Sequence, residues 1–184
     1  MKRLLNMLLC MQASLFLLAT VPLLPVATNW KADPAKAKVT FSIKGPFGTV
    51  HGSFSGLKAN IRFDEKDLAG SAVSASVDAA TVSTGIGLRN RDLRKKEEWL
   101  NTDKYPQISF ASKKIEKAST GYKAVGDLTL KGATRHIEIP FTFTPSGNSG
   151  VFKGHFTINR REYKVGKEGG SVGSDITIDL EVPV

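Results

Sequence analysis

Histidine is the side chain here that most readily does acid–base or metal chemistry, and the chain has three, His51, His136 and His155. They lie far apart in the sequence, and neither a His-x-His pair, an HExxH motif nor an acidic cluster accompanies them. His51 and His155 fall in strand-like stretches, where a histidine that faces solvent is the favoured interpretation. We therefore predict no catalytic residue and no metal site, and expect a protein that is not an enzyme.

Basic side chains form the strongest charge signal, in a chain of net charge +9. They gather in two groups: Arg89, Arg91, Arg94, Lys95 and Lys96, then Arg160, Arg161, Lys164 and Lys167. Nucleic-acid binding would need strands with aromatic side chains for base stacking, which neither group has, so no nucleic acid is expected. We expect solvated cations, with contact to an anionic lipid headgroup through Arg89, Arg94 or Arg160 as the alternative.

The elements that must position these side chains are strands. The composition, 41% hydrophobic and 23% charged over 184 residues, is that of one globular domain. Apolar and polar residues alternate in stretches near residues 39–43, 50–54, 61–63, 73–77, 108–112, 122–130, 137–143, 152–158 and 176–182. Period-two alternation separated by short turns predicts about eight antiparallel strands. Closure into a barrel or folding into a sandwich would cover the apolar face.

Two segments interrupt this rhythm. Residues 86–100 predict a short helix, with Asp92 as its cap and Leu93 in its first turn, lying as a plug or lid across one end of a barrel. The glycine-rich stretch 166–173 lacks the spacing of a phosphate-binding loop. We expect it to form a loop at the barrel rim, with a flap over a ligand entrance as the alternative.

The N-terminal segment has the pattern of a targeting sequence. Lys2 and Arg3 precede an apolar, leucine-rich stretch, and the next charge is Lys31. This pattern predicts a secretory signal peptide over residues 1–27 and an exported domain over residues 28–184, hence a periplasmic protein. An uncleaved membrane anchor is the alternative, because the stretch is long enough to cross a bilayer. The only cysteine, Cys10, lies in this segment, so no internal disulfide is expected.

Six short motifs occur in the order found in the YceI-like family of exported bacterial proteins, which the chain resembles from Trp30 to its end. They are Trp30-Lys-Ala-Asp33 with Val39-Thr-Phe41, Gly52-Ser-Phe54, Val82-Ser-Thr-Gly85 with Arg89-Asn-Arg-Asp-Leu-Arg94, Tyr105-Pro-Gln-Ile-Ser-Phe110, Gly126-Asp-Leu-Thr-Leu-Lys-Gly-Ala-Thr134 and Ile158-Asn-Arg-Arg-Glu-Tyr163. One position departs from the pattern, because Lys164 stands where the family has glycine. A positive φ there would strain a lysine.

The resemblance implies an all-β, antiparallel, eight-stranded lipocalin-like barrel with a short helical insert closing one end. It also implies a lipid-binding protein that carries or stores a polyisoprenoid or an isoprenoid quinone in an elongated apolar interior, without a cofactor. Such binding is physically reasonable, since each buried CH₂ group contributes about 0.8 kcal/mol. A homodimer and transient contact with a membrane surface are left open.

Candidate wall positions are the larger members of the alternating apolar sets. They are Phe41, Phe54, Phe63, Phe110, Leu128, Ile139, Phe141, Phe156 and Ile178. The competing interpretation of each is ordinary core packing, since protein interiors are close-packed. If the whole interior were solid, the alternative function would be a stress-related adaptor that binds a protein partner through its surface. An enzyme that acts on a lipid would need a polar dyad inside the barrel, which the apolar sets do not provide.

Overall fold

The computed structural model describes residues 28–167 and 169–184, and the predicted signal peptide lies outside them. Ten strands make up most of this part of the chain: β1 Thr28–Lys31, β2 Lys38–Gly45, β3 Gly48–Phe54, β4 Lys58–Phe63, β5 Ala72–Asp78, β6 Gln107–Lys117, β7 Tyr122–Leu130, β8 Ala133–Ser146, β9 Ser149–Asn159 and β10 Asp175–Pro183. One α-helix, α1 Gly87–Lys95, and two short 3₁₀ helices, η1 Ala79–Thr81 and η2 Arg160–Tyr163, complete the described elements.

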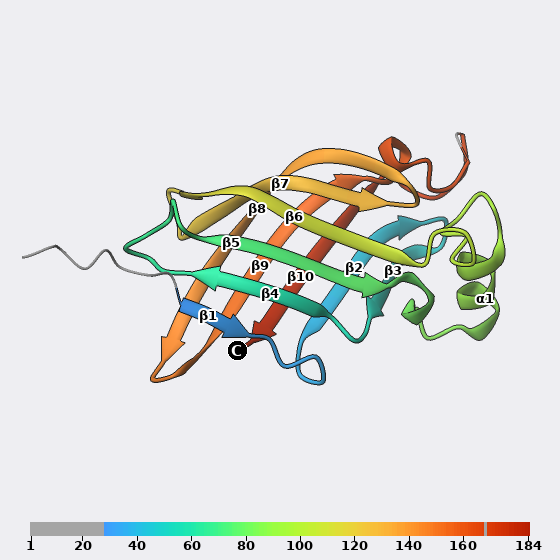
Figure 1. Ribbon diagram of the computed structural model, residues 1–184. Helices are drawn as coiled ribbons and strands as arrows, with labels where there is room; N and C mark the ends of the chain where they lie inside the picture. Colours follow the sequence, from blue (N-terminus) through green and yellow to red (C-terminus); the bar gives the residue numbers. More distant parts are fainter. Residues whose placement is uncertain (1–27, 168) are drawn as a thin grey trace, which may run out of the picture.

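All ten strands belong to one antiparallel sheet of order β1-β4-β5-β6-β7-β8-β9-β10-β2-β3. The sheet curls around an interior as a half-barrel, with β1 and β3 as its edges (Figure 1). The all-β, antiparallel prediction is confirmed, although the described sheet has ten strands rather than eight. β1 escaped prediction because its four residues, Thr28–Lys31, include only one large apolar side chain and so show no alternation.

The curvature of the sheet has a local cause in the pairing of β6 with β7. The register shifts between Ser112 and Lys114, which marks a β-bulge opposite Gly126 and Val125. A Cβ at Gly126 would lie 2.2 Å from the carbonyl oxygen of Ala111. Gly126 therefore permits the close approach of backbones at the bulge, and bulges bend a sheet.

The helix α1 lies at one end of the curled sheet, together with η2 and the turn between β2 and β3 (Figure 1). The predicted position at the end of the barrel is therefore correct, but the predicted start is wrong. The helix begins at Gly87 after Ile86, which makes no side-chain cap, and Asp92 lies inside it. The Asp92 carboxylate instead forms an ion pair with Lys96 Nζ, one turn later, at 2.8 Å. An aspartate therefore predicts the start of a helix only weakly when a lysine four residues later can pair with its carboxylate.

The other end of the interior is filled with aromatic rings. Phe63 on β4 is 1% exposed, and its ring centroid lies 5.0–5.6 Å from those of Tyr122, Phe141, Phe143 and Phe152. Trp30 on β1 adds its ring to Phe143 at 4.9 Å and donates its indole N–H to the carbonyl of Phe63. We call Trp30, Phe63, Tyr122, Phe141, Phe143 and Phe152 the aromatic cluster.

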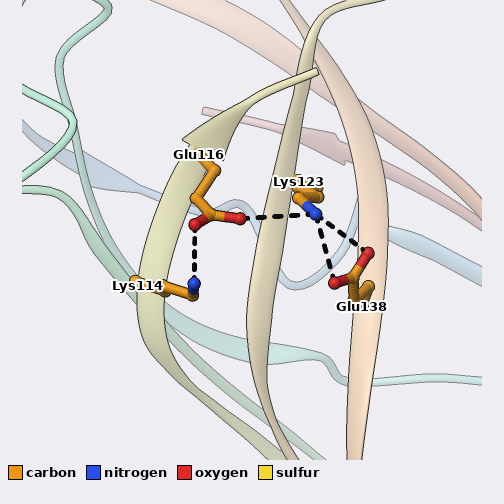
Figure 2. Close-up of polar contacts among 4 residues, drawn as sticks. All are labelled: Lys114, Glu116, Lys123 and Glu138. Carbon is orange, nitrogen blue, oxygen red and sulfur yellow. Dashed lines mark hydrogen bonds and ion pairs between the residues drawn. The ribbon is translucent and has the colours of Figure 1, made fainter. Parts of the chain in front are cut away.

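The outer face near this cluster carries a network of ion pairs. Lys123 on β7, next to Tyr122, contacts Glu116 on β6 and Glu138 on β8, and Lys114 contacts Glu116 (Figure 2). These pairs join three neighbouring strands on the solvent side. They are exposed, so each contributes little to the stability of the fold.

Candidate functional site

The interior between the aromatic cluster and α1 is hollow. A cavity of about 690 Å³ lies inside the curled sheet, within the range of roughly 300–1,000 Å³ that is typical of small-molecule sites. Its wall is almost entirely apolar and takes residues from β2 to β10 as well as from α1. Phe141 and Phe152 line it as well as belonging to the aromatic cluster, so that cluster forms its floor.

The strand register explains why this space remains open. Ala59 on β4 pairs with Ala75 on β5, which pairs with Phe110 on β6, which pairs with Leu128 on β7. All four residues line the cavity, and the two alanines leave room where larger side chains would meet those opposite. The sheet therefore builds a hollow by placing small residues beside large ones in one row.

A second row crosses β9, β10 and β2. Phe156 pairs with Ile178, and Ile178 pairs with Phe41, so these three side chains follow one another around the wall. Phe41 then pairs with Gly52 on β3, where an added Cβ would meet the Phe41 ring at 2.3 Å. The ring thus lies over the glycine instead of filling the centre.

Eight of the nine predicted wall residues line this cavity. They are Phe41, Phe54, Phe110, Leu128, Ile139, Phe141, Phe156 and Ile178. Phe63 is the exception, because its ring lies behind Phe141 and Phe152 in the aromatic cluster. Alternation identifies which face of a strand points inward, but not how far along the barrel axis a side chain lies. Whether the eight residues contact a ligand stays a prediction.

The three arginines predicted for a headgroup have different environments. Arg89 on α1 lines the cavity, but Arg94 does not, and its Nη1 donates to the carbonyl of Ala80 instead. Five residues separate the two, which is about 140° around a helix, so they cannot face the same way. Arg94 is therefore not a wall residue in this structure.

Arg160 lines the cavity and is 1% exposed, so the expected solvated position is wrong for this residue. Its guanidinium donates to the backbone carbonyls of Val165, Val172 and Gly173, and lies 5.8 Å from the Trp99 ring. Burial lowers the pKa of Arg160, but an arginine remains charged in proteins. The side chain holds the described parts of the glycine-rich loop against the end of the barrel.

This loop also contains the spacing of a serine-nucleophile motif. Residues 169–173 read Gly-Gly-Ser-Val-Gly, which fits the G-x-S-x-G spacing of a serine nucleophile. That motif requires a sharp turn from a strand into a helix. Here Ser171 is exposed in a loop that leads into β10, so the spacing carries no catalytic geometry.

The histidines lie on the outside of the sheet. His136 contacts Asp127 at 3.1 Å and His155 contacts Asp179 at 2.6 Å, while His51 is exposed on β3. Within residues 28–167 and 169–184, no three His, Cys, Asp or Glu residues are grouped to hold a metal ion. In that same part of the chain, no helix has both the length and the apolar character to cross a membrane.

Lys164 adopts the positive φ that was expected to strain a lysine at this position. Lys164 follows η2 with φ 58° and ψ 30°, the left-handed conformation that favours glycine. Its carbonyl accepts a hydrogen bond from Lys131 Nζ at 2.7 Å. The local turn is thus the one a glycine would form, and lysine adopts it.

Sequence comparisons place this architecture among known proteins. A model of the YceI-like domain matches residues 30–184. UPF0312 protein YE1254 of Yersinia enterocolitica is 30% identical over 166 residues, which cover 85% of this chain and 86% of that protein.

Solved structures give the same result. The crystal structure of Burkholderia cenocepacia BcnA is similar with a TM-score of 0.78 and 26% identity, covering 83% of this chain and 99% of that one. A polyisoprenoid-binding domain from Saccharophagus degradans, implicated in plant cell wall breakdown, has a TM-score of 0.64 and 14% identity over 86% of this chain and 98% of its own. The second likeness is one of fold alone. With its motifs, sheet and matched residues in agreement, the chain belongs to the YceI-like family.

Proposed function

We propose that this protein is an exported lipid-binding protein that carries or stores a polyisoprenoid or an isoprenoid quinone in its apolar cavity. The observation that carries the proposal is the cavity of about 690 Å³, walled by apolar side chains from nine strands and α1. Few polar groups reach this wall, so a ligand that needs many hydrogen bonds would lose those it makes to water. A long hydrocarbon chain loses none.

The energetics favour a chain of several isoprene units. Each buried CH₂ contributes about 0.8 kcal/mol, so a chain that extends from α1 to the aromatic cluster gains affinity with every unit. Arg89 and Asp92 line the cavity near α1, where a polar head would remain close to water. The Saccharophagus degradans domain of the same fold is described as polyisoprenoid-binding, which supports the ligand class.

Export and the absence of catalysis are parts of the same proposal. The basic start and apolar stretch of residues 1–27 support export to the periplasm. A carrier needs no reactive group in its cavity, and the three histidines lie on the outer face. The solid-cored adaptor is the weaker candidate, because it requires an interior without this cavity.

A binding titration with a matched pair of variants tests the proposal. Ala75→Phe places a ring inside the cavity, whereas Ala111→Phe makes the same change at an exposed position on the neighbouring strand β6. We expect the natural chain and Ala111→Phe to bind an isoprenoid quinone alike, and Ala75→Phe to bind at least tenfold more weakly. Equal binding by all three proteins, or no binding by the natural chain, would refute the proposed ligand site.

A further inference from the structure

Large exposed apolar side chains occur at three positions in the described part of the chain, Phe47, Ile86 and Leu88, with exposures of 102%, 49% and 62%. Single exposed apolar residues are common on soluble proteins and need no explanation. Here, however, all three line the same cavity. They come from elements almost forty residues apart, the turn between β2 and β3 and the start of α1, which lie at the same end of the molecule (Figure 1). Exposed residues that also line the cavity mark its opening.

The backbone holds these side chains out in water. Gly45 pairs with Gly48, so Pro46 and Phe47 form a two-residue turn at the tip of the hairpin, and Gly48 has a φ of 118°. None of the nine residues of α1 is fully buried, and its start makes no side-chain cap. The hairpin tip and the first turn of α1 thus expose apolar side chains to water. This exposure is unfavourable, and it adds nothing to the stability of the fold.

Basic residues flank this apolar group in the sequence. Lys44 precedes the turn, and residues 86–96 contain five basic residues and one acidic residue. Asp92 pairs with Lys96 and Arg91, and Lys95 pairs with Asp103 outside this segment. Among residues 28–167 and 169–184, no carboxylate forms an ion pair with Lys44 or Arg89. We call Lys44, Phe47, Ile86, Leu88 and Arg89 the mouth surface.

From this arrangement we infer that the mouth surface docks on an anionic phospholipid bilayer, with Phe47, Ile86 and Leu88 inserted among the lipids and Lys44 and Arg89 at the headgroups. Exposed apolar side chains flanked by cations are the pattern of an interfacial membrane contact. Basic residues near an anionic leaflet each strengthen binding by about fivefold. The partner is identified by this complementarity and by continuity with an apolar cavity, which lets a hydrocarbon chain pass between bilayer and interior without crossing water. The purpose of this docking rests on the proposed function. Vesicle binding tests the docking itself, without any isoprenoid ligand.

Vesicle binding measures the docking directly. All ten strands lie within residues 28–183, so the chain from Thr28 onward contains the whole described fold and lacks the apolar leader. We expect this protein to co-float with vesicles of phosphatidylcholine and phosphatidylglycerol at least tenfold more strongly than with phosphatidylcholine alone, and less strongly at high salt. Equal or absent binding to both kinds of vesicle would overturn the inference.

Matched variants locate the contact. Phe47→Ser/Ile86→Ser/Leu88→Ser and Lys44→Gln/Arg89→Gln should each lower vesicle binding by about tenfold or more, the second pair in line with its two lost charges. Lys31→Gln/Lys66→Gln removes the same charge from exposed positions outside the mouth surface and should change binding by less than about twofold. If the mouth variants bind like the natural chain, the docking surface is wrong.

A label reports insertion independently of affinity. The only cysteine, Cys10, is absent from the chain that begins at Thr28, so Phe47→Cys and Lys66→Cys each provide a single attachment site. A polarity-sensitive fluorophore at position 47 should shift to the blue with anionic vesicles, and the same fluorophore at position 66 should not. Identical responses would contradict insertion of the hairpin tip.

The two proposals fail in different ways. Ala75→Phe fills the cavity but lies outside the mouth surface, so it should lose isoprenoid binding and keep vesicle binding. Vesicle binding without any isoprenoid binding would reject the proposed function and leave the docking surface in place. If the natural chain binds an isoprenoid and the mouth variants still bind vesicles normally, the proposed function stands and the docking surface is rejected.

Discussion

The two ends of the curled sheet use the same apolar alternation for opposite results. At the filled end, four aromatic rings lie within 5.6 Å of the Phe63 centroid. Toward α1, small residues such as Ala59 and Ala75 face the hollow between the walls. The comparison indicates that hydrophobicity selects the inward face, whereas the size of each inward residue decides where the interior is solid.

The ends also differ in what holds them together. The filled end depends on rings packed against rings, which is a large apolar contribution. The open end depends on one buried cation, since Arg160 joins Val165, Val172 and Gly173 through their carbonyls. We therefore expect the fold to depend on the aromatic rings at the filled end and on Arg160 at the open end, and less on the side chains that line the cavity.

The largest expected effect is on folding, at the filled end. Phe63→Ala should lower the free energy of unfolding by about 3–5 kcal/mol, because it leaves a void among rigid rings. Phe156→Ala removes the same ring from the cavity wall, where open space already exists, and should lower it by about 1–3 kcal/mol. Urea denaturation measures both. Equal losses would break the distinction between a filled and a hollow end.

Arg160 gives the next effect. Arg160→Met leaves three backbone carbonyls without their donor and should lower the free energy of unfolding by about 3 kcal/mol. Hydrogen exchange should accelerate first at the Val165 and Gly173 amides. Arg161→Met alters an exposed neighbour and should change stability by less than about 0.5 kcal/mol. If both variants behave alike, the buried guanidinium does not hold this end.

Lys164 sharpens the comparison with a gain of stability. Lys164→Gly should raise the free energy of unfolding by about 0.5–1 kcal/mol, because φ is 58° at this position and glycine has no Cβ to strain there. Lys164→Ala loses the same side chain but keeps the Cβ, so thermal denaturation should show no such gain. A gain for both would assign the effect to charge instead of backbone conformation.

The smallest effect is the acid response of the ion network outside the filled end. Hydrogen bonds from Lys114 and then Lys123 hold the pKa of Glu116 below its ordinary value of 4.5. A lowered carboxylate pKa stabilises the fold above the unfolded pKa, and this contribution is lost as pH falls through the folded pKa. Lys123→Met should therefore lower stability slightly at pH 7, and the difference from the natural chain should shrink as pH falls from about 5 to about 3.

A matched lysine controls for charge in that experiment. Lys66→Met removes an exposed lysine that makes no ion pair with Glu116 and does not shift its pKa, and should leave the acid response as it is. Unfolding midpoints at pH 7 and pH 3.5 compare the two variants. An unchanged acid slope in Lys123→Met would show that the network does not couple to folding.

Much of the architecture was predictable because it depends on period-two alternation. The β5, β8, β9 and β10 patterns identified the inward faces, and eight of nine predicted wall residues line the cavity. Phe63 was predicted to line the cavity but lies deeper along the barrel axis, in the aromatic cluster. That depth depends on the register across six strands. The sequence pattern carries no information on that distance.

The polar part of the site was harder to predict for a different reason. Arg160 looked like one of several exposed basic residues, and its burial depends on carbonyls of a loop up to thirteen residues away. Arg94 and Arg89 could not be separated without the true start of α1 at Gly87. The role of Phe47 at the cavity opening depended on a hairpin tip that meets α1 only in the folded chain.

The central claim is that the hollow between α1 and the aromatic cluster holds a hydrocarbon chain. Native mass spectrometry of the exported protein, purified from cells without added lipid, tests it most directly. The account predicts one isoprenoid molecule per chain in the natural protein and in Ala111→Phe, and its loss in Ala75→Phe. A natural protein that is repeatedly recovered without lipid, or an Ala75→Phe protein that retains the same lipid, would contradict it.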